Sequence, residues 1–151
     1  MDRWLHSISR QGVQQMYLHF GHHEYILPDC IFSCSTLSRL HLLWLCVTPN
    51  GSFTPSSLPN VTSFHFEHVD FGSRKYSFHP VDVPRLENLS FIACEYIFNC
   101  DITLKNLRSL KIKGCFTSLS SQQLCDFSAF IFDVTSVCYL ELDNVSCLYV
   151  L

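Results

Sequence analysis

Histidine and cysteine have the widest chemical scope in this sequence, with eight and nine copies among 151 residues. Two histidines, His41 and His65, are 24 positions apart and take equivalent places on neighbouring strands of the repeat described below. A metal ion can bridge two such imidazoles, but two ligands are too few for a zinc site. Glu67 is one position off the row of the histidines. We therefore predict exposed, unliganded histidines, with no metal site and no cofactor.

The cysteines are predicted to be buried, reduced thiols. Cys30 and Cys34 have no second Cys/His pair at the spacing that zinc sites use. Other cysteines fall within apolar patterns, where an unpaired cysteine behaves as a small apolar residue. The count is odd, and residues 1–4 have no secretory layout. Reduced thiols indicate a cytoplasmic or nuclear protein.

No catalytic motif stands out. The sequence has neither a glycine-rich phosphate loop nor a G-x-S-x-G elbow. Cys125 is followed by Asp126, but nothing in the sequence places a general base beside the thiol. We therefore predict that the chain is not an enzyme.

The elements that would position these residues follow one nine-residue pattern. Residues 86–94 and 107–115 both have apolar residues at their first, fourth and sixth positions and a cysteine at the ninth, whereas residues of any type occupy the other positions. The period of two in the middle predicts a short strand with alternate residues buried, and the flanking apolar positions are expected to bend inward. The copies begin 21 to 30 residues apart, and the other four cover 13–21, 37–45, 61–69 and 137–145.

This pattern resembles the leucine-rich repeat, which has a length of roughly 20–29 residues. One coil cannot bury its own apolar side, so coils stack and their strands align as a parallel sheet. The predicted fold class is α/β: a leucine-rich-repeat solenoid, a right-handed superhelix with the sheet on its concave face and short helices and loops on its convex face. Residues 1–12 are expected to be the partial helix of a preceding repeat, and residues 13–151 a domain of about six coils.

The segments between strands carry further expectations. Trp4, Leu5 and Ile8 would share one face of the first helix. Residues 146–151 are too few for another coil, so the last coil lacks a polar cap, as in a fragment, a truncated product or an end covered by a partner. Helices are predicted over residues 2–10 and 122–132, and loops over residues 48–52 and 72–80.

The strand residues that point away from the core form the predicted binding surface. They mix aromatic, imidazole and charged side chains, as protein-binding surfaces do. A solvated face without a partner is the alternative. The residues predicted to contact a protein target on the concave face are Gln15, Tyr17, His19, Arg39, His41, Leu43, His65, Glu67, Asn88, Lys111, Lys113, Tyr139 and Glu141.

Charge and hydropathy argue against nucleic acid and membranes as partners. The net charge of −3 gives no broad basic surface for nucleic acid, and no apolar run reaches the ~18 residues that a membrane span needs. Lys111 and Lys113 should lie opposite Glu141 and Asp143 and pair with them, with little gain in stability at an exposed site. Four Asn-x-Ser/Thr triplets favour a secreted alternative, although three of them fall in or beside predicted strands.

Three stretches, residues 2–13, 27–37 and 58–69, together resemble the repeat region of plant F-box/LRR proteins of the FBD-associated group. The resemblance implies a substrate receptor whose F-box docks on the Skp adaptor of a cullin ubiquitin ligase while the repeats hold the target. The 151 residues show no F-box and no FBD segment, so Skp is an expected partner only within a fuller chain. The predicted function is therefore a protein-interaction module. The alternatives are a secreted LRR recognition or inhibitor protein and a truncated, non-functional fragment.

Overall fold

The computed structural model of the chain describes residues 3–21, 25, 28–46, 58–71, 78–97, 100–102, 105–115 and 136–143. Most of the ordered elements are short strands, as the repeat predicts. The elements are α1 (Arg3–Ser9), β1 (Gln15–His19), the 3-10 helix η1 (Asp29–Ser33), β2 (Arg39–Cys46), β3 (Ser63–Asp70), β4 (Phe78–Val81), β5 (Asn88–Ile92), β6 (Cys100–Ile102), β7 (Ser109–Lys113) and β8 (Tyr139–Asp143).

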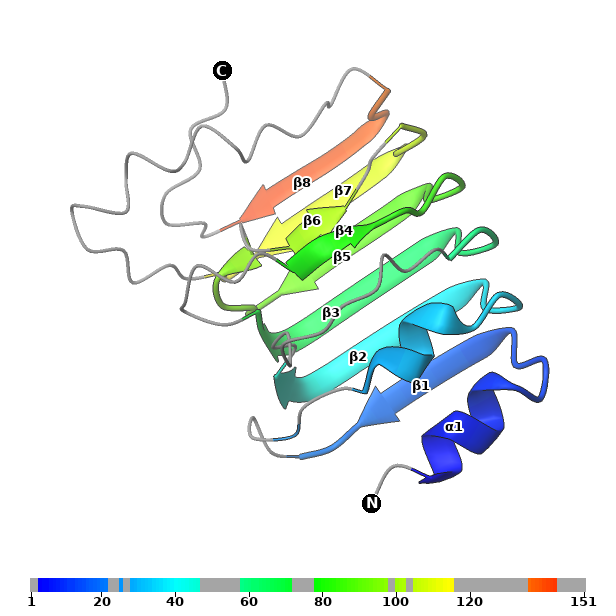
Figure 1. Ribbon diagram of the computed structural model, residues 1–151. Helices are drawn as coiled ribbons and strands as arrows, with labels where there is room; N and C mark the ends of the chain where they lie inside the picture. Colours follow the sequence, from blue (N-terminus) through cyan, green and yellow to red (C-terminus); the bar gives the residue numbers. More distant parts are fainter. Residues whose placement is uncertain are drawn as a thin grey trace.

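Six strands form one parallel sheet, in the order β1-β2-β3-β5-β7-β8 (Figure 1). All five neighbouring pairs are parallel, and each pattern copy supplies one strand. β4 and β6 form a second, two-stranded parallel sheet. The predicted α/β class with a parallel sheet and few helices is confirmed.

The register of the strands is the one that the pattern predicts. Leu40 pairs with Phe64, Phe64 with Leu89, and Leu89 with Leu110. These four side chains are 1–2% exposed, so the inward residues of successive repeats pack in a single file. Full burial of such a side chain contributes about 1.5–3 kcal/mol relative to leaving it in water.

The covered face of the sheet carries the helices. Leu5 from α1 and Ile31 and Phe32 from η1 belong to the same buried cluster as the inward strand residues. Phenylalanines fill the middle of this cluster: the Phe66 ring lies 5.4 Å from Phe91 and 5.3 Å from Phe71, centroid to centroid. The opposite face of the six-stranded sheet, which we call the open face, carries the alternate strand residues.

In four of the repeats a bend follows the last open-face residue, and glycine occupies only one of these four bends. In four successive repeats the residue after the last open-face position has a positive φ: Trp44 (55°), His68 (52°), Ala93 (49°) and Gly114 (57°). The bend directs the next residue back into the core, as the inward flanking positions of the pattern predict. These next residues are Leu45, Val69, Cys94 and Cys115, each at most 1% exposed.

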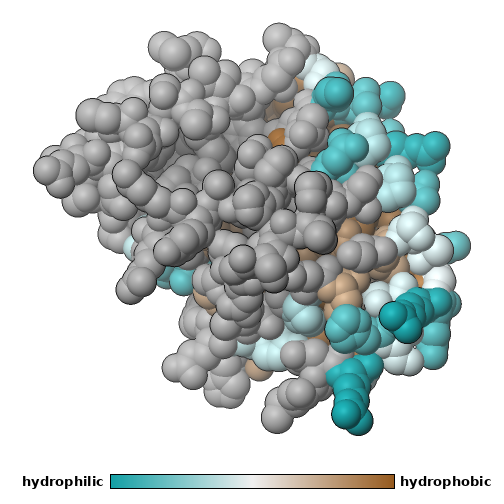
Figure 2. All heavy atoms as spheres, in the orientation of Figure 1, coloured by the Kyte–Doolittle hydropathy of each residue, from teal (hydrophilic) through white to brown (hydrophobic). Residues whose placement is uncertain are grey.

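A polar ladder joins the repeats where the strands begin. The residue just before each of the last five copies of the pattern bonds through its side chain to the preceding repeat. Asn60 Nδ2 donates to Ser35 O (2.7 Å), and Asn106 Nδ2 donates to Pro84 O (2.6 Å). Figure 2 shows hydrophilic residues gathered along this edge of the molecule. The ladder consists of Thr36, Asn60, Arg85, Asn106 and Ser136.

Three local expectations are corrected. Residues 78–80 of the predicted loop over 72–80 belong to β4 (Phe78–Val81), because the backbone of β4 pairs with the distant β6. Trp4 is 45% exposed although Leu5 on the same helix is buried, because an adjacent position is about 100° around the axis. Leu140 and Leu142 of β8 are 47% and 40% exposed, since β8 has a strand neighbour only at β7 among the described residues.

Other expectations lie outside the described residues. These are the loop over 48–52, the helix over 122–132 and the apolar end at 146–151. Within the described part of the chain, no helix has the length and apolar character needed to cross a membrane.

Candidate protein-interaction surface

The open face has a central row with one residue from each strand. Because the strands are parallel and in register, residues at the same position sit side by side at the strand spacing of about 4.8 Å. The order predicted from the pattern is confirmed pair by pair. The central row is Tyr17, His41, His65, Ser90, Lys111 and Glu141.

The first three residues of the row form a run of rings. The Tyr17 and His41 ring centroids are 4.4 Å apart at an interplanar angle of 76°, and those of His41 and His65 are 3.9 Å apart at 71°. Edge-to-face packing of this kind is a favourable arrangement of aromatic rings. Tyr17 is still 62% exposed, so it offers a large amphipathic ring to solvent. Beside this run lies a hollow of about 240 Å³ lined by Gln15, Arg39 and Ser63 as well as the rings.

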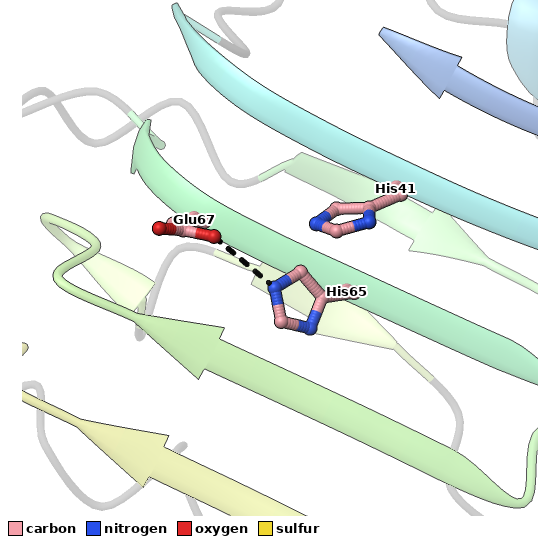
Figure 3. A group of neighbouring side chains, drawn as sticks. All are labelled: His41, His65 and Glu67. Carbon is pink, nitrogen blue, oxygen red and sulfur yellow. Dashed lines mark ion pairs between the residues drawn. The ribbon is translucent and has the colours of Figure 1, made fainter. Parts of the chain in front are cut away.

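Glu67 joins the two histidines. Its Oε2 lies 3.5 Å from His65 Nε2, and potential ligand atoms of His41, His65 and Glu67 all lie within 4.8 Å of one another. Figure 3 shows the three side chains grouped on one side of the sheet, with the carboxylate beside the His65 imidazole. Glu67 lies off the row of the histidines in the backbone register, as predicted, but its side chain reaches the His65 imidazole, which was not predicted.

His41 is the most constrained member of this group. Its Nε2 is buried and has no hydrogen-bond partner within the described part of the chain. Burial lowers the pKa of His41 below its usual 6.5, the nearby His65 lowers it further, and Glu67 acts in the opposite direction. The neutral imidazole is therefore favoured, and a neutral imidazole keeps a lone pair on one of its two ring nitrogens.

The far end of the open face is an ion-pair network. Glu141 accepts from Lys111 Nζ at 3.2 Å, from Lys113 Nζ, and from Tyr139 Oη at 2.9 Å. These hydrogen bonds, that of Lys113 first, lower the pKa of Glu141 to about 2. The predicted pairing of the two lysines with the acidic strand is thus present, and both meet on Glu141. A second hollow, of about 260 Å³, extends from His65 to this network.

The remaining predicted contact residues all lie on the same face. Gln15, His19, Arg39 and Asn88 are exposed. Leu43 is only 8% exposed, because it is flanked in register by His19 and Glu67, and so it offers little contact area. Ser63, Ser90 and Ser109 also line the hollows, but their small hydroxyls gave no signal that set them apart in the sequence. The stacked pair Trp44 and His68, with centroids 4.0 Å apart, was also missed, because each residue lies at the positive-φ bend near the end of its strand, outside the alternating part of the pattern.

Comparison with known proteins points to one family. The model of the LRR repeats of FBD-associated F-box protein At5g56370 matches residues 1–132. F-box/FBD/LRR-repeat protein At1g13570 of Arabidopsis thaliana is 38% identical over 42 residues, which are 28% of this chain and 10% of that relative. The match therefore spans a small part of the relative's length. No solved structure matches the chain.

Proposed function

This chain belongs to the family of LRR repeats of FBD-associated F-box proteins, and we propose that it recognises a protein target with its open face. The family supports protein interaction as the general role. The particular face is our inference from the described side chains. The observation that carries it is the in-register row from Tyr17 to Glu141, which changes from aromatic to ionic across six strands.

The proposed architecture extends beyond the observed sheet. We infer that the repeats wind as a right-handed solenoid, with residues 1–12 completing a preceding repeat and the open face on the concave side. The single file of buried residues and the polar ladder support this inference, because both recur once per repeat. Stacked repeats of this kind present extended concave surfaces to partners.

The chemistry of the open face suits a protein partner. Tyrosine is enriched at the energetic centres of interfaces, and Tyr17 is exposed at one end of the ring run. Rim charges mainly affect the rate and specificity of association, and Lys111, Lys113 and Glu141 provide both signs at the other end. A target with an apolar or aromatic anchor for the first hollow and polar groups for the second would fit this arrangement.

The proposed cellular role is target recognition for a ubiquitin ligase receptor. The relatives are F-box proteins by their names, and in that setting the repeats would select the protein to be modified. Contact with a Skp adaptor would require an F-box in a fuller chain. The proposed compartment is the cytoplasm or the nucleus.

The test is quantitative affinity capture from plant-cell extract. The bait is the 151-residue chain, and the variant carries Tyr17→Ala, His41→Ala and His65→Ala. A matched control carries Arg3→Ala, Trp4→Ala and His6→Ala, which change exposed residues of α1. We expect specific proteins to be enriched by the wild type and the control and lost with the open-face variant, with the melting temperature of each bait recorded. Equal capture by all three folded baits would contradict the proposed surface.

A further inference from the structure

We propose that His41, His65 and Glu67 form a binding site for a divalent transition-metal ion such as Zn²⁺ on the open face. The site goes beyond target recognition, and it can be tested on the chain without any target. It also revises the expectation from sequence that the two histidines are unliganded.

The residue types fit the ion. Zinc is commonly bound by histidine nitrogen and carboxylate oxygen, and imidazole suits several first-row transition metals. Two imidazoles and one carboxylate are a ligand set that leaves further coordination positions open. Two strands supply the three groups: His41 comes from β2, and His65 and Glu67 come from β3.

The distances fit as well. Metal–ligand bonds of about 2.1 Å at tetrahedral angles hold the ligand atoms about 3.4 Å apart. His65 Nε2 and Glu67 Oε2 are 3.5 Å apart, and the set as a whole lies within 4.8 Å. The His41 and His65 rings already lie edge to face with their centroids 3.9 Å apart (Figure 3), so modest side-chain rotations would bring all three atoms to one ion.

Unsatisfied polar atoms lie on both sides of His65. His41 Nε2 and Ser90 Oγ are its neighbours in the central row, and neither has a hydrogen-bond partner among the described residues. Buried polar atoms in proteins are usually satisfied, and a buried atom without a partner is costly. An ion held at His41 Nε2 would satisfy the first of these atoms.

Two of the three ligand side chains of the site reach solvent. The side chains of His65 and Glu67 are 28% and 34% exposed, so an ion can reach them without opening the core. Three protein ligands leave a fourth position for water or for a donor atom from a bound molecule. The expected ion is therefore exchangeable, unlike the closed structural sites that four protein ligands form.

The experiment is a Co²⁺ titration of the apo chain followed by visible absorption, with Zn²⁺ competition. The variants are His65→Ala and Glu67→Gln, and the matched control is His19→Ala, which removes another histidine of the same face. Because the chain has nine cysteines, the near-ultraviolet region is recorded to detect cobalt–thiolate charge transfer. Circular dichroism of each variant verifies folding.

We expect one equivalent of Co²⁺ to give a visible band without thiolate charge transfer, and Zn²⁺ to displace it. Mutating a residue that only orients a metal ligand typically weakens metal binding about 10–100-fold. Because His65 is itself a ligand, His65→Ala should weaken binding by at least about tenfold, whereas His19→Ala should leave it unchanged. Equal binding by the folded His65→Ala variant, loss of binding in His19→Ala, or a spectrum dominated by thiolate would overturn the site. If His65→Ala unfolds, Glu67→Gln decides in the same way.

Discussion

His41 and His65 lie opposite each other on adjacent parallel strands, with their ring centroids 3.9 Å apart. Their separation of 24 residues in the sequence equals the length of one repeat at that point. The same spacing brings Leu40 beside Phe64 in the core. The repeat length therefore positions the core and the open face together, and a change of register would disturb both.

Titration of His41 tests the environment of its ring. In the metal-free protein, its NMR-detected pKa should lie below 6.5, because burial and His65 disfavour the imidazolium. The titratable groups that lie against His41 are Tyr17 on β1 and His65 and Glu67 on β3. His65→Ala should raise the pKa of His41, and Glu67→Gln should lower it further. A rise in the Glu67→Gln variant would contradict the arrangement.

The sign of the stability effect follows from the same shift. When the folded-state pKa of a histidine is below its unfolded-state pKa, the neutral imidazole stabilises the fold. This contribution is complete at pH values above the unfolded-state pKa. That contribution is lost as the pH falls through 6.5 toward the folded pKa. We therefore expect the free energy of unfolding to fall less in His41→Ala than in the wild type as the pH is lowered through this window. Urea denaturation in the presence of EDTA, which keeps the protein metal-free, provides the measurement.

Glu141 offers a second titration. Its pKa of about 2 depends first on the hydrogen bond from Lys113. Since the folded pKa is depressed, the network stabilises the fold above the unfolded value near 4.5, and this is lost as the pH falls toward 2. Lys113→Ala should raise the carboxyl pKa measured by carbon-detected NMR, and Lys105→Ala, which changes an exposed lysine of the same chain, should not. An unchanged Glu141 pKa in Lys113→Ala would contradict the hydrogen bond between the two residues.

The buried file makes a stability prediction. Leu89→Ala or Leu110→Ala should each reduce the free energy of unfolding by about 2–5 kcal/mol, because each leaves a cavity between neighbouring repeats. Asn88→Ala changes an exposed residue of the same strand and should stay within about 0.5 kcal/mol of wild type. Urea denaturation provides the measurement. A similar loss in Asn88→Ala and Leu89→Ala would contradict the inward and outward assignment.

The polar ladder makes a separate prediction. Asn106→Ala removes the donor to Pro84 O and should reduce the free energy of unfolding by about 1 kcal/mol. Lys105→Ala, at the neighbouring exposed position, serves as the control. Thermal melting of both variants compares them. Equal melting temperatures for wild type and Asn106→Ala would mean that water replaces this bond without cost.

Much of the sheet could be predicted because its register follows from burial. A shift of one residue in β3 would put His65 in the core and Phe64 in water, so only one alignment of the pattern is acceptable. The pattern copy over 137–145 supplies the observed strand β8, Tyr139–Asp143. The predicted coiling into a solenoid remains a proposal.

What escaped prediction depends on contacts that no local pattern encodes. β4 forms because Phe78 pairs with Cys100, a partner more than twenty residues away in a stretch without alternation. The bend residues Trp44 and His68 have side chains that give no sign of a positive φ. Glu67 reaches His65 through the side-chain geometry of two residues on one strand, and the register between strands does not determine that contact.

Photo-crosslinking tests the central claim, recognition through the open face, most directly. The photoreactive amino acid p-benzoylphenylalanine would replace Tyr17 in one sample and Trp4, an exposed aromatic residue of α1, in the other. Irradiation in plant-cell extract should give discrete crosslinked proteins from position 17 and not from position 4. Crosslinked proteins from position 4 alone would contradict the account.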